Sequence, residues 1–459
     1  MFCYFCRQTN VYMVMLKNYF TILLSCLWIQ GVFAQANLLQ SGPMVGYSEM
    51  KEVLLWVQTK SSAKVKFAYW EKGNASQKKF TDEVSTKADE AFTARLVANQ
   101  VEPGKRYEYE LYINNQKVSR SYPLEFQTQV LWQYRTEPPN FKFATGSCLY
   151  INDTPYDRPG KPYGSNYEIL TRIYEQKPDF MLWLGDNIYL REVDWGTKTG
   201  IFYRNTHTRS TPELQALLGS VHHYAIWDDH DYGPNDSDKS YPHKDLTLEA
   251  FKLFWGNPNY GIANPQGKGI TGTFVWGDVQ FFLLDDRYFR TANNNFAGNR
   301  CILCEEQVEW LINALASSQA SFKIIAVGSQ FLSLSKTKEN FINFPEERQK
   351  ILDAIVKNKI SGVVFLTGDR HFTELSKTNT NPPIYDLTVS PLTSGTFNPE
   401  KEQNELRVPN TLVTEHNFAL IEVTGKRKER VMSIKIFNKD GKELWKQEIQ
   451  EKELLYSRN

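Results

Sequence analysis

The pattern of hydrophobic and polar positions divides the chain after the signal-like segment into two regions with different predicted secondary structure. From Asn37 to Gln129, short runs such as EVLLWVQTK, AKVKFAYW and RYEYELYIN alternate apolar with polar residues, and turn-forming stretches such as KGNAS and VEPGK separate them. A period of two over short runs is typical of strands that bury one face. The pattern predicts a small β-sandwich over residues 36–134.

Beyond RTEPPN, the predicted linker at residues 135–140, apolar strands alternate with helical segments. Predicted strands include FKFATGSC, DFMLWLGDN, HHYAIWDDHD, FKIIAVGSQ and GVVFLTGDRH, whereas SNYEILTRIYEQ and PEERQKILDAIVKN have helical spacing. The run GTFVWGDVQFFLLDDR predicts a hairpin, and three strand-like runs end the chain. We therefore expect an α/β (α+β) layered fold over residues 138–459, with mixed β-sheets flanked by helices.

Residues 1–34 have the pattern of a secretory signal peptide. A short basic region precedes an apolar run and small residues that favour cleavage after Ala34. Residues 1–14 fit no signal pattern, which makes Met15 an alternative start. Lipid attachment at Cys26 is a second, less favoured interpretation. The apolar run is short for a membrane span, so we expect an exported protein with no span in the mature chain.

Composition narrows the classes of partner. The 459 residues carry a formal net charge of +1, without a long basic block. This balance argues against a nucleic-acid-binding patch or an anionic membrane surface. Aromatic residues make up 14% of the chain, as expected of a globular core rather than a disordered one. The sequence leaves the oligomeric state open.

Three cysteines remain after removal of the predicted signal peptide. Cys301 and Cys304 form a single C-x-x-C with no second pair, which makes zinc a poor candidate. A disulfide and two free buried thiols are the alternatives. Cys148 is then left without an obvious partner, and it stands at the end of a predicted strand.

Six predicted strands share one feature, a small or apolar end followed by groups that can bind metal. In layered α/β folds, ligands bind beyond the carboxyl ends of the strands, so these groups are expected to meet in one cleft. Taken one at a time, each motif also has a structural explanation, such as a turn or a helix cap. The groups are Cys148, Asp186, Tyr189, Asp228, Asp229, His230, Asp231, Asp285, Asp286, Gln330, Asp369 and His371.

Closely spaced carboxylates repel one another and are costly to desolvate unless a cation lies among them. Oxygen ligands suit Ca²⁺, Mg²⁺ or Mn²⁺, whereas a thiolate and a phenolate favour ferric iron. Two metal ions a few ångström apart suit in-line phosphoryl displacement. The cluster therefore predicts a metal-dependent enzyme acting on phosphate esters.

The motifs GSC, GDNIY, WDDHDYG, LDDRYFR, GSQF and LTGDRH, in this order, resemble those of the alkaline phosphatase D (PhoD-like) family of metallophosphatases. This family belongs to the calcineurin-like superfamily. The stretch SGPMVGYSEMKEVLLWVQT also resembles the family's N-terminal sandwich domain, which we expect to be fibronectin-III-like. The resemblance covers nearly the whole predicted mature chain and implies a calcineurin-like layered fold.

The resemblance also implies roles for individual residues. It gives Asp186 the place of a carboxylate that bridges two metals, and His230 the place of a histidine that contacts phosphate and protonates the leaving group. Zn²⁺, Mg²⁺ and Mn²⁺ are alternatives to the implied pair of ferric iron and Ca²⁺. The implied ligands are Cys148, Asp186, Tyr189 and His371 for iron, and Asp186, Asp229 and Asp369 for calcium.

One element of the superfamily pattern is missing from the chain. The middle histidine of the superfamily has no counterpart here, and Ser329 or Gln330 stands at its position. We therefore include Gln330 among the candidate catalytic residues, together with His230 and Arg287.

Several other residues keep more than one interpretation. Arg287, Arg290 and Arg370 are all candidates for holding phosphate oxygens, and an internal Asp286–Arg287 ion pair is an equal alternative. Asp228, Asp231, Asn187 and Asn235 are candidate ligands, supporting groups or helix caps. The histidines outside the motifs are expected to be structural or surface groups; these are His222, His223 and His243.

The sequence thus favours an exported metal-dependent phosphoesterase that hydrolyses phosphomonoesters, phosphodiesters or both, on small-molecule or polymeric substrates. One alternative is a cell-surface binding protein in which the metals are structural. Another is a metal-dependent carboxylic esterase, although the chain lacks the G-x-S-x-G motif of common esterases.

Overall fold

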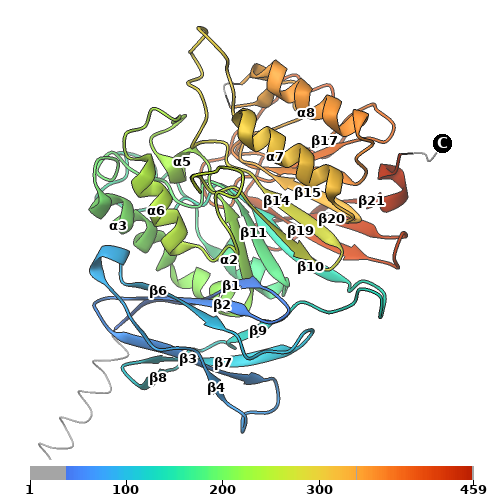
Figure 1. Ribbon diagram of the computed structural model, residues 1–459. Helices are drawn as coiled ribbons and strands as arrows, with labels where there is room; N and C mark the ends of the chain where they lie inside the picture. The colour runs from blue at the N-terminus through green and yellow to red at the C-terminus, as the bar shows by residue number, and fades with distance from the viewer. Residues whose placement is uncertain (1–37, 338, 457–459) are drawn as a thin grey trace, which may run out of the picture.

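The computed structural model describes residues 38–337 and 339–456, so the predicted signal peptide lies outside the described residues. Within them, most strands belong to two large sheets packed face to face, and helices lie on both outer sides (Figure 1). The predicted α/β fold with mixed sheets flanked by helices is confirmed.

The first sheet carries three parallel strands at its centre. These are β10 (Phe141–Gly146), β11 (Phe180–Leu184) and β12 (His222–Ile226), in that order. The C-terminal strands extend the sheet beyond β10 in antiparallel pairings, as the strand-like runs at the end of the chain predict. They are β19 (Asn417–Thr424), β20 (Val431–Asn438) and β21 (Glu443–Gln450).

The second sheet begins with the predicted hairpin, formed by β13 (Gly272–Trp276) and β14 (Val279–Leu283). Gly277 lies in its two-residue turn at φ 60°, in the left-handed region that favours glycine. Parallel strands follow from β14 onward, and one antiparallel strand lies at the far edge. They are β15 (Phe322–Ala326), β16 (Val363–Thr367), β18 (Tyr385–Thr388) and the edge strand β17 (Glu374–Lys377).

The two sheets bury their facing sides against each other through aromatic rings. The ring of Phe281 in β14 lies 5.4 Å from the rings of both Phe143 and Phe180 in the first sheet. Because side chains alternate along a strand, the next residue, Phe282, faces the other way into a separate core. That core lies beneath α7 (Cys304–Ser317) and α8 (Pro345–Lys357).

The remaining helices complete the layers. Among them, α3 (Lys198–Arg209) and α6 (Lys244–Phe254) lie on the opposite side of the sheets from α7 and α8 (Figure 1). The shorter helical elements are α2 (Glu168–Glu175), α4 (Gln215–Ser220), α5 (Asp229–Tyr232), η1 (Ala88–Glu90), η2 (Pro212–Leu214), η3 (Phe341–Asn343) and η4 (Glu451–Leu454).

The N-terminal strands form two packed layers at one end of the molecule (Figure 1). One layer contains β1 (Leu39–Ser48), β2 (Val53–Thr59) and β6 (Thr93–Ala98). The other contains β3 (Lys64–Glu71), β4 (Lys79–Phe80), β5 (Val84–Ser85), β7 (Arg106–Ile113), β8 (Gln116–Val118) and β9 (Glu125–Gln127).

The N-terminal strands are not separate from the first large sheet. Val45 of β1 pairs in parallel with His222 of β12, so one continuous sheet runs through both regions. Alternation within each strand reports which face is buried, but not which distant strand lies beside it. For that reason the sequence pattern predicts the sandwich without this junction.

The three cysteines among the described residues differ in state. Cys301 and Cys304 form a disulfide, which decides between the two alternatives, while Cys148 is a buried free thiol.

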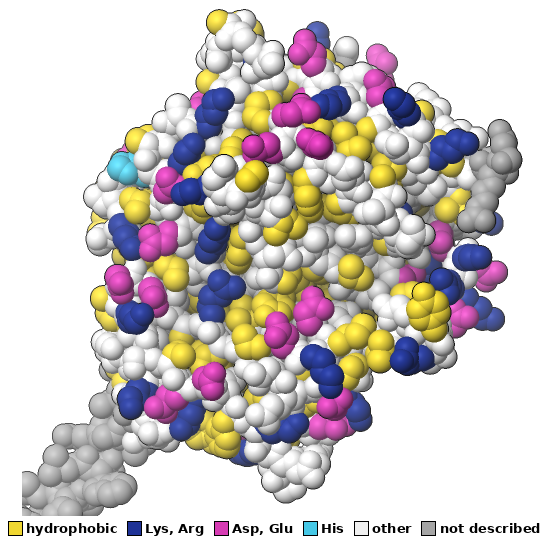
Figure 2. Space-filling model, viewed as in Figure 1, with side chains coloured by type: hydrophobic (Ala, Val, Ile, Leu, Met, Phe, Trp, Pro, Cys, Tyr) yellow, Lys and Arg dark blue, Asp and Glu magenta, His cyan; other side chains and the backbone are white. Residues whose placement is uncertain are grey.

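On the face seen in Figure 2, basic and acidic side chains are interspersed. In residues 38–337 and 339–456, no helix combines the length and the apolar character needed to cross a bilayer.

Candidate metal centre

Four strand ends bring their polar residues together at one side of the two sheets. Cys148 follows β10, Asp186 follows β11, Asp229 follows β12, and His371 follows β16. Within each of three overlapping groups, the candidate ligand atoms lie within 4.8 Å of one another. The groups are Cys148 with Asp186 and His371, Asp186 with Asp229 and His230, and Asp228 with Asp229 and Asp369. The convergence predicted for six strand ends is therefore observed for four of them.

The backbone turns sharply at several of these positions. Cys148, Asp186, Asp369 and His371 have φ values of 61°, 50°, 64° and 58°. Residues other than glycine rarely adopt this left-handed region, and such conformations often mark functional sites. Gly185 has a more specific reason, since a Cβ there would lie 2.6 Å from the Cβ of Asp228. The turn after β11 can approach the Asp228 loop only through glycine.

The first group contains Cys148, Asp186, Tyr189 and His371. The Asp186 Oδ2 atom lies 3.5 Å from the Cys148 thiol and 3.1 Å from the Tyr189 hydroxyl. The Tyr189 hydroxyl lies 3.3 Å from His371 Nε2. A hydrogen bond from His371 Nδ1 to the Gly395 carbonyl, at 2.5 Å, leaves Nε2 free to act as a ligand toward this group.

Burial disfavours charge in this group. It raises the pKa of the Cys148 thiol to about 11 and raises the pKa of Tyr189 well above its ordinary value. Burial, with the nearby Asp229 carboxylate, also raises the pKa of Asp186 well above its usual range. A thiol, a phenol and a carboxyl that all resist ionisation become good ligands only beside a cation, which favours their charged forms.

The ligands predicted for the second ion are divided between the other two groups, which share Asp229: Asp186 belongs to one and Asp369 to the other. Burial raises the pKa of Asp369 to about 7. Burial acts in the same direction on Asp229, but His230, Arg287 and the Asp236 backbone N–H outweigh it and hold the Asp229 pKa below its ordinary value. Asp229 Oδ1 has no hydrogen-bond partner among the described residues. Buried carboxylate oxygens without partners are costly, and a bound metal ion would satisfy them.

Asp228 and Asp231 both shape the loop, and Asp228 also keeps one oxygen, Oδ2, without a hydrogen-bond partner among the described residues. Asp228 caps α5 by accepting a hydrogen bond from the Asp229 N–H at 2.9 Å, and Asp231 accepts one from the Asp228 N–H at 3.0 Å. Asp231 also accepts from the Asn187 N–H at 3.1 Å, which joins this loop to the turn after β11. This capping box accounts for two of the closely spaced carboxylates.

The three candidate arginines are held by carboxylates of the protein itself. Arg287 is fully buried, with Nε 2.5 Å from Asp228 and Nη2 2.5 Å from Glu339, whereas Asp286 lies 3.9 Å away. Glu402 accepts two hydrogen bonds from Arg370, at 2.7 and 2.8 Å. Arg290 lies 3.6 Å from Glu339. These pairings place Arg287 behind the metal-binding groups, where it neutralises charge.

The amide nitrogen of Gln330 is engaged by residues outside the clustered groups. Its amide N–H₂ donates to Glu374 and Thr388, at 2.9 Å each, in a buried network beneath the second sheet's edge. The structure therefore does not bring Gln330 together with the other candidate catalytic residues. Two histidines outside the motifs are structural as expected: His222 and His223 lie buried in β12 and are hydrogen-bonded to backbone groups.

His230 lies between the candidate metal-binding groups and a cavity. Its Nε2 lies 4.0 Å from Asp229 Oδ2, and its ring lies 4.2 Å from the Tyr189 ring. Together with Tyr189 it lines a cavity of about 680 Å³. Burial lowers its pKa below the ordinary value. A histidine in this place can reach both a group held by metal and a group that occupies the cavity.

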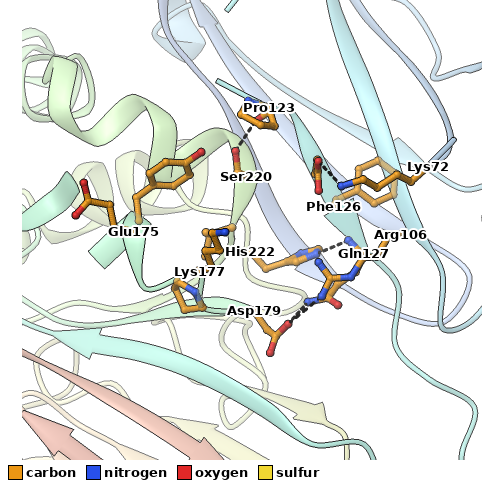
Figure 3. Close-up of a pocket in the computed structure, with 14 residues that line it drawn as sticks. Lys72, Arg106, Pro123, Phe126, Gln127, Glu175, Lys177, Asp179, Ser220 and His222 are labelled. Carbon is orange, nitrogen blue, oxygen red and sulfur yellow. Dashed lines mark hydrogen bonds and ion pairs between the residues drawn. The ribbon is translucent and has the colours of Figure 1, made fainter. Parts of the chain in front are cut away.

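A different cavity, of about 480 Å³, lies at the opposite end of β12 (Figure 3). Gln127 from β9, Asp179 before β11, and His222 at the start of β12 meet there (Figure 3). Their polar atoms are paired with one another or with backbone groups. No sequence motif of the candidate site contributes to this cavity.

Face-to-face mixed sheets with acidic and sulfur-containing groups at the strand ends define a layered α/β protein with a candidate metal-binding site. The PhoD-like phosphatase model matches residues 143–428, more than half of the chain, so the chain belongs to the PhoD-like phosphatase family. A model described as a domain of unknown function, DUF7800, matches residues 36–131.

Two known proteins illustrate the relationship. Alkaline phosphatase D of Bacillus subtilis (strain 168) is 25% identical over 328 residues, which cover 61% of this chain and 53% of the relative. The match thus spans only about half the relative's length. The solved structure of PhoD superposes with a TM-score of 0.73 at 18% identity, over 89% of this chain and 92% of the other. At that identity the superposition shows a shared fold.

Proposed function

We propose that the protein is an exported phosphoesterase that hydrolyses phosphomonoesters, phosphodiesters or both at a site for two metal ions. The main observation is the buried cluster around Asp186 and Asp229, whose carboxylates repel each other and whose Asp229 Oδ1 lacks a hydrogen-bond partner among the described residues. A protein that needed these groups only for folding would have paired them internally.

The donor atoms suit two different cations. Cys148, Tyr189 and His371, with Asp186, would hold the first ion, and their thiolate and phenolate favour ferric iron. Asp229 and Asp369, with Asp186 shared between the sites, would hold the second, for which oxygen ligands favour Ca²⁺. Mg²⁺, Mn²⁺ and Zn²⁺ are alternatives. Bound ions of this kind supply Lewis acidity and lower the pKa of a bound water.

His230 is proposed to give a proton to the leaving oxygen. Its position beside Asp229 and at the wall of the 680 Å³ cavity supports this role. Arg287 is proposed to act indirectly, by holding Asp228 and balancing the charge of Asp229, since its guanidinium is fully buried between carboxylates. We do not assign Gln330 a part in the reaction, because its amide is directed elsewhere.

The domain organisation and export are part of the proposal. Residues 36–134 would form a sandwich domain and residues 138–459 the catalytic domain. Residues 1–34 would direct export and be removed. The disulfide between Cys301 and Cys304 supports an oxidising location, where such bonds persist.

One experiment separates this function from its alternatives. Purified protein is analysed for metals and assayed on an aryl phosphate, a bis-aryl phosphate and an aryl acetate, with and without chelator. The proposal expects phosphate-ester turnover that the chelator abolishes. Bound metal without any turnover would favour a binding protein with structural metals, and turnover confined to the acetate would favour a carboxylic esterase.

A further inference from the structure

The cavity beside His230 is large compared with a phosphate group. Its volume of about 680 Å³ falls within the range of about 300–1,000 Å³ typical of pockets that bury whole small-molecule ligands. Tyr189 and His230 form part of its wall, so it opens directly from the metal-binding groups. A site that acted on phosphate alone would not need this space.

Aromatic rings form one wall of this cavity. The rings of Tyr150 and Tyr163 meet edge to face at 4.9 Å, and Tyr163 lies 6.2 Å from the Tyr189 ring. Tyr150 is buried, but Tyr163 keeps 47% of its surface exposed. Tyr163 is thus a ring supported on one side by neighbours and accessible on the other.

Tyr150, which packs against the Tyr163 ring, is itself held by paired side chains. The Tyr150 hydroxyl donates to Asp157 at 2.8 Å, and the Arg191 guanidinium lies 3.9 Å from the centre of the Tyr150 ring. Arg191 in turn is buried and pairs with Asp157 at 2.8 Å. The cation and the carboxylate pair with each other next to the tyrosines, which holds the rings in place. Both also line the cavity, together with the charged side chains of Arg158, Lys161 and Glu192.

We propose that this cavity receives the organic group of the phosphate ester, and that Tyr163 selects for a flat aromatic or heteroaromatic group. The proposal rests on the proposed phosphoesterase function. His230 lies at the boundary between the metal-binding groups and the cavity, so the group in the cavity is the one that leaves with the proton of His230. An accessible ring held in place at its wall favours a flat partner through stacking.

Tyr163 also touches a candidate metal ligand, which the experiment has to separate from stacking. Its hydroxyl lies 3.2 Å from His371 Nδ1. Tyr163→Phe removes this contact and keeps the ring, whereas Tyr163→Leu removes both. Tyr156 offers a matched control, because it is 42% exposed in the same loop but packs against Tyr203 and does not line the cavity.

The test compares phenyl phosphate with cyclohexyl phosphate as substrates, and phenylphosphonate with methylphosphonate as inhibitors. Each variant is compared with the wild type on the same compound, so intrinsic reactivity cancels. Tyr163→Leu should raise KM for phenyl phosphate and Ki for phenylphosphonate roughly three- to tenfold, with little change for the other two compounds. Tyr156→Leu should leave both values for the phenyl compounds within about twofold of wild type. Tyr163→Phe, which keeps the ring, should keep the preference for the phenyl over the cyclohexyl ester.

Equal changes for phenyl and cyclohexyl compounds in Tyr163→Leu would overturn the selection for flat groups. So would an equal loss of phenylphosphonate binding in Tyr156→Leu. If the metal-loaded wild type hydrolysed neither ester, the proposed phosphoesterase function would fail instead, and the two failures are therefore distinguishable.

Discussion

Aspartate and histidine residues lie at both ends of β11 and β12, but their hydrogen bonding differs between the two ends. At the start of these strands, Asp179 accepts hydrogen bonds from Gln127 and from the Lys142 N–H, at 2.7 and 2.9 Å, and His222 is bonded through both ring nitrogens. At their ends, Asp229 keeps an oxygen without a hydrogen-bond partner in the described part of the chain. Both ends border a cavity.

The hydrogen bonding of an aspartate can therefore distinguish a structural role from a functional one. The sandwich supplies Gln127 to Asp179 and His222, so those groups are satisfied by the fold itself. The carboxyl ends instead gather Asp186, Asp229 and Asp369, and burial there acts against their charged forms. Bound cations would favour the charged forms of these carboxyl groups.

The largest effect is expected from Asp186→Asn. The substitution removes the carboxylate that would be shared by both ions, so turnover of any phosphate ester should fall by more than about 100-fold. Asp179→Asn makes the same change at the other end of β11 and is the matched control. It should cost about 1 kcal/mol of stability and leave turnover near normal. Comparable losses of turnover in the two variants would remove the distinction between the two ends.

The next largest effect is expected from His230→Ala, and it should depend on the leaving group. General acid catalysis is typically worth ~10²–10⁴-fold. An alkyl phosphate should lose most of that factor, whereas a nitrophenyl phosphate, whose leaving group departs readily as an anion, should lose far less. Metal content should stay near normal. Equal losses on both esters would contradict the proton-donor role even if His230 proved essential.

A smaller effect is expected from Glu339→Gln, which tests the support behind the metal-binding groups. Arg287 is shared between Glu339 and Asp228, and its Nη2 lies 4.0 Å from Asp229 Oδ1. Without the Glu339 charge, the guanidinium should move toward Asp229 and compete with the metal. Changes in such supporting residues typically weaken metal binding by about 10–100-fold. Titration with chelator measures this, and an unchanged affinity would show that Glu339 only packs beside Arg287.

The smallest effect is expected in the pH dependence of stability, and it concerns His222 at the start of β12, where both ring nitrogens are hydrogen-bonded. Burial lowers the pKa of His222 to about 4, while an unfolded histidine has a pKa of about 6.5. The stability that neutral His222 contributes is therefore fully present above about pH 6.5 and is lost as the pH falls toward 4. Urea unfolding gives the free energy of unfolding at pH 7 and at pH 4.5. Between these pH values, the free energy of unfolding of His222→Gln should fall by about 2 kcal/mol less than that of the wild type. Identical losses would contradict a buried, neutral His222.

Much of the site was predictable because it follows one rule of layered folds. Cys148, Asp186, Asp229, Asp369 and His371 each lie a few residues beyond an apolar strand, and parallel strands of one sheet present their carboxyl ends at one edge. The hairpin and the alternation in the N-terminal strands were likewise visible in the pattern of hydrophobic positions.

The remainder depends on contacts between distant residues. Glu339 and Glu402 hold the candidate arginines, but both lie in irregular segments that have no periodicity to predict their position. The direction of the Gln330 side chain is set by Glu374 and Thr388, which follow much later in the chain. The pairing of β1 with β12 is equally non-local.

The number of metal ions bound per chain distinguishes a metal centre at the strand ends from a purely structural cluster. Wild-type, Asp186→Asn and Asp179→Asn proteins would be purified in parallel without added metal, and their metals counted per chain by elemental analysis. We expect two ions per chain in the wild type and in Asp179→Asn, and a clear loss in Asp186→Asn. Equal metal content in all three proteins, or a wild-type protein that hydrolyses phosphate esters without bound metal, would contradict this expectation.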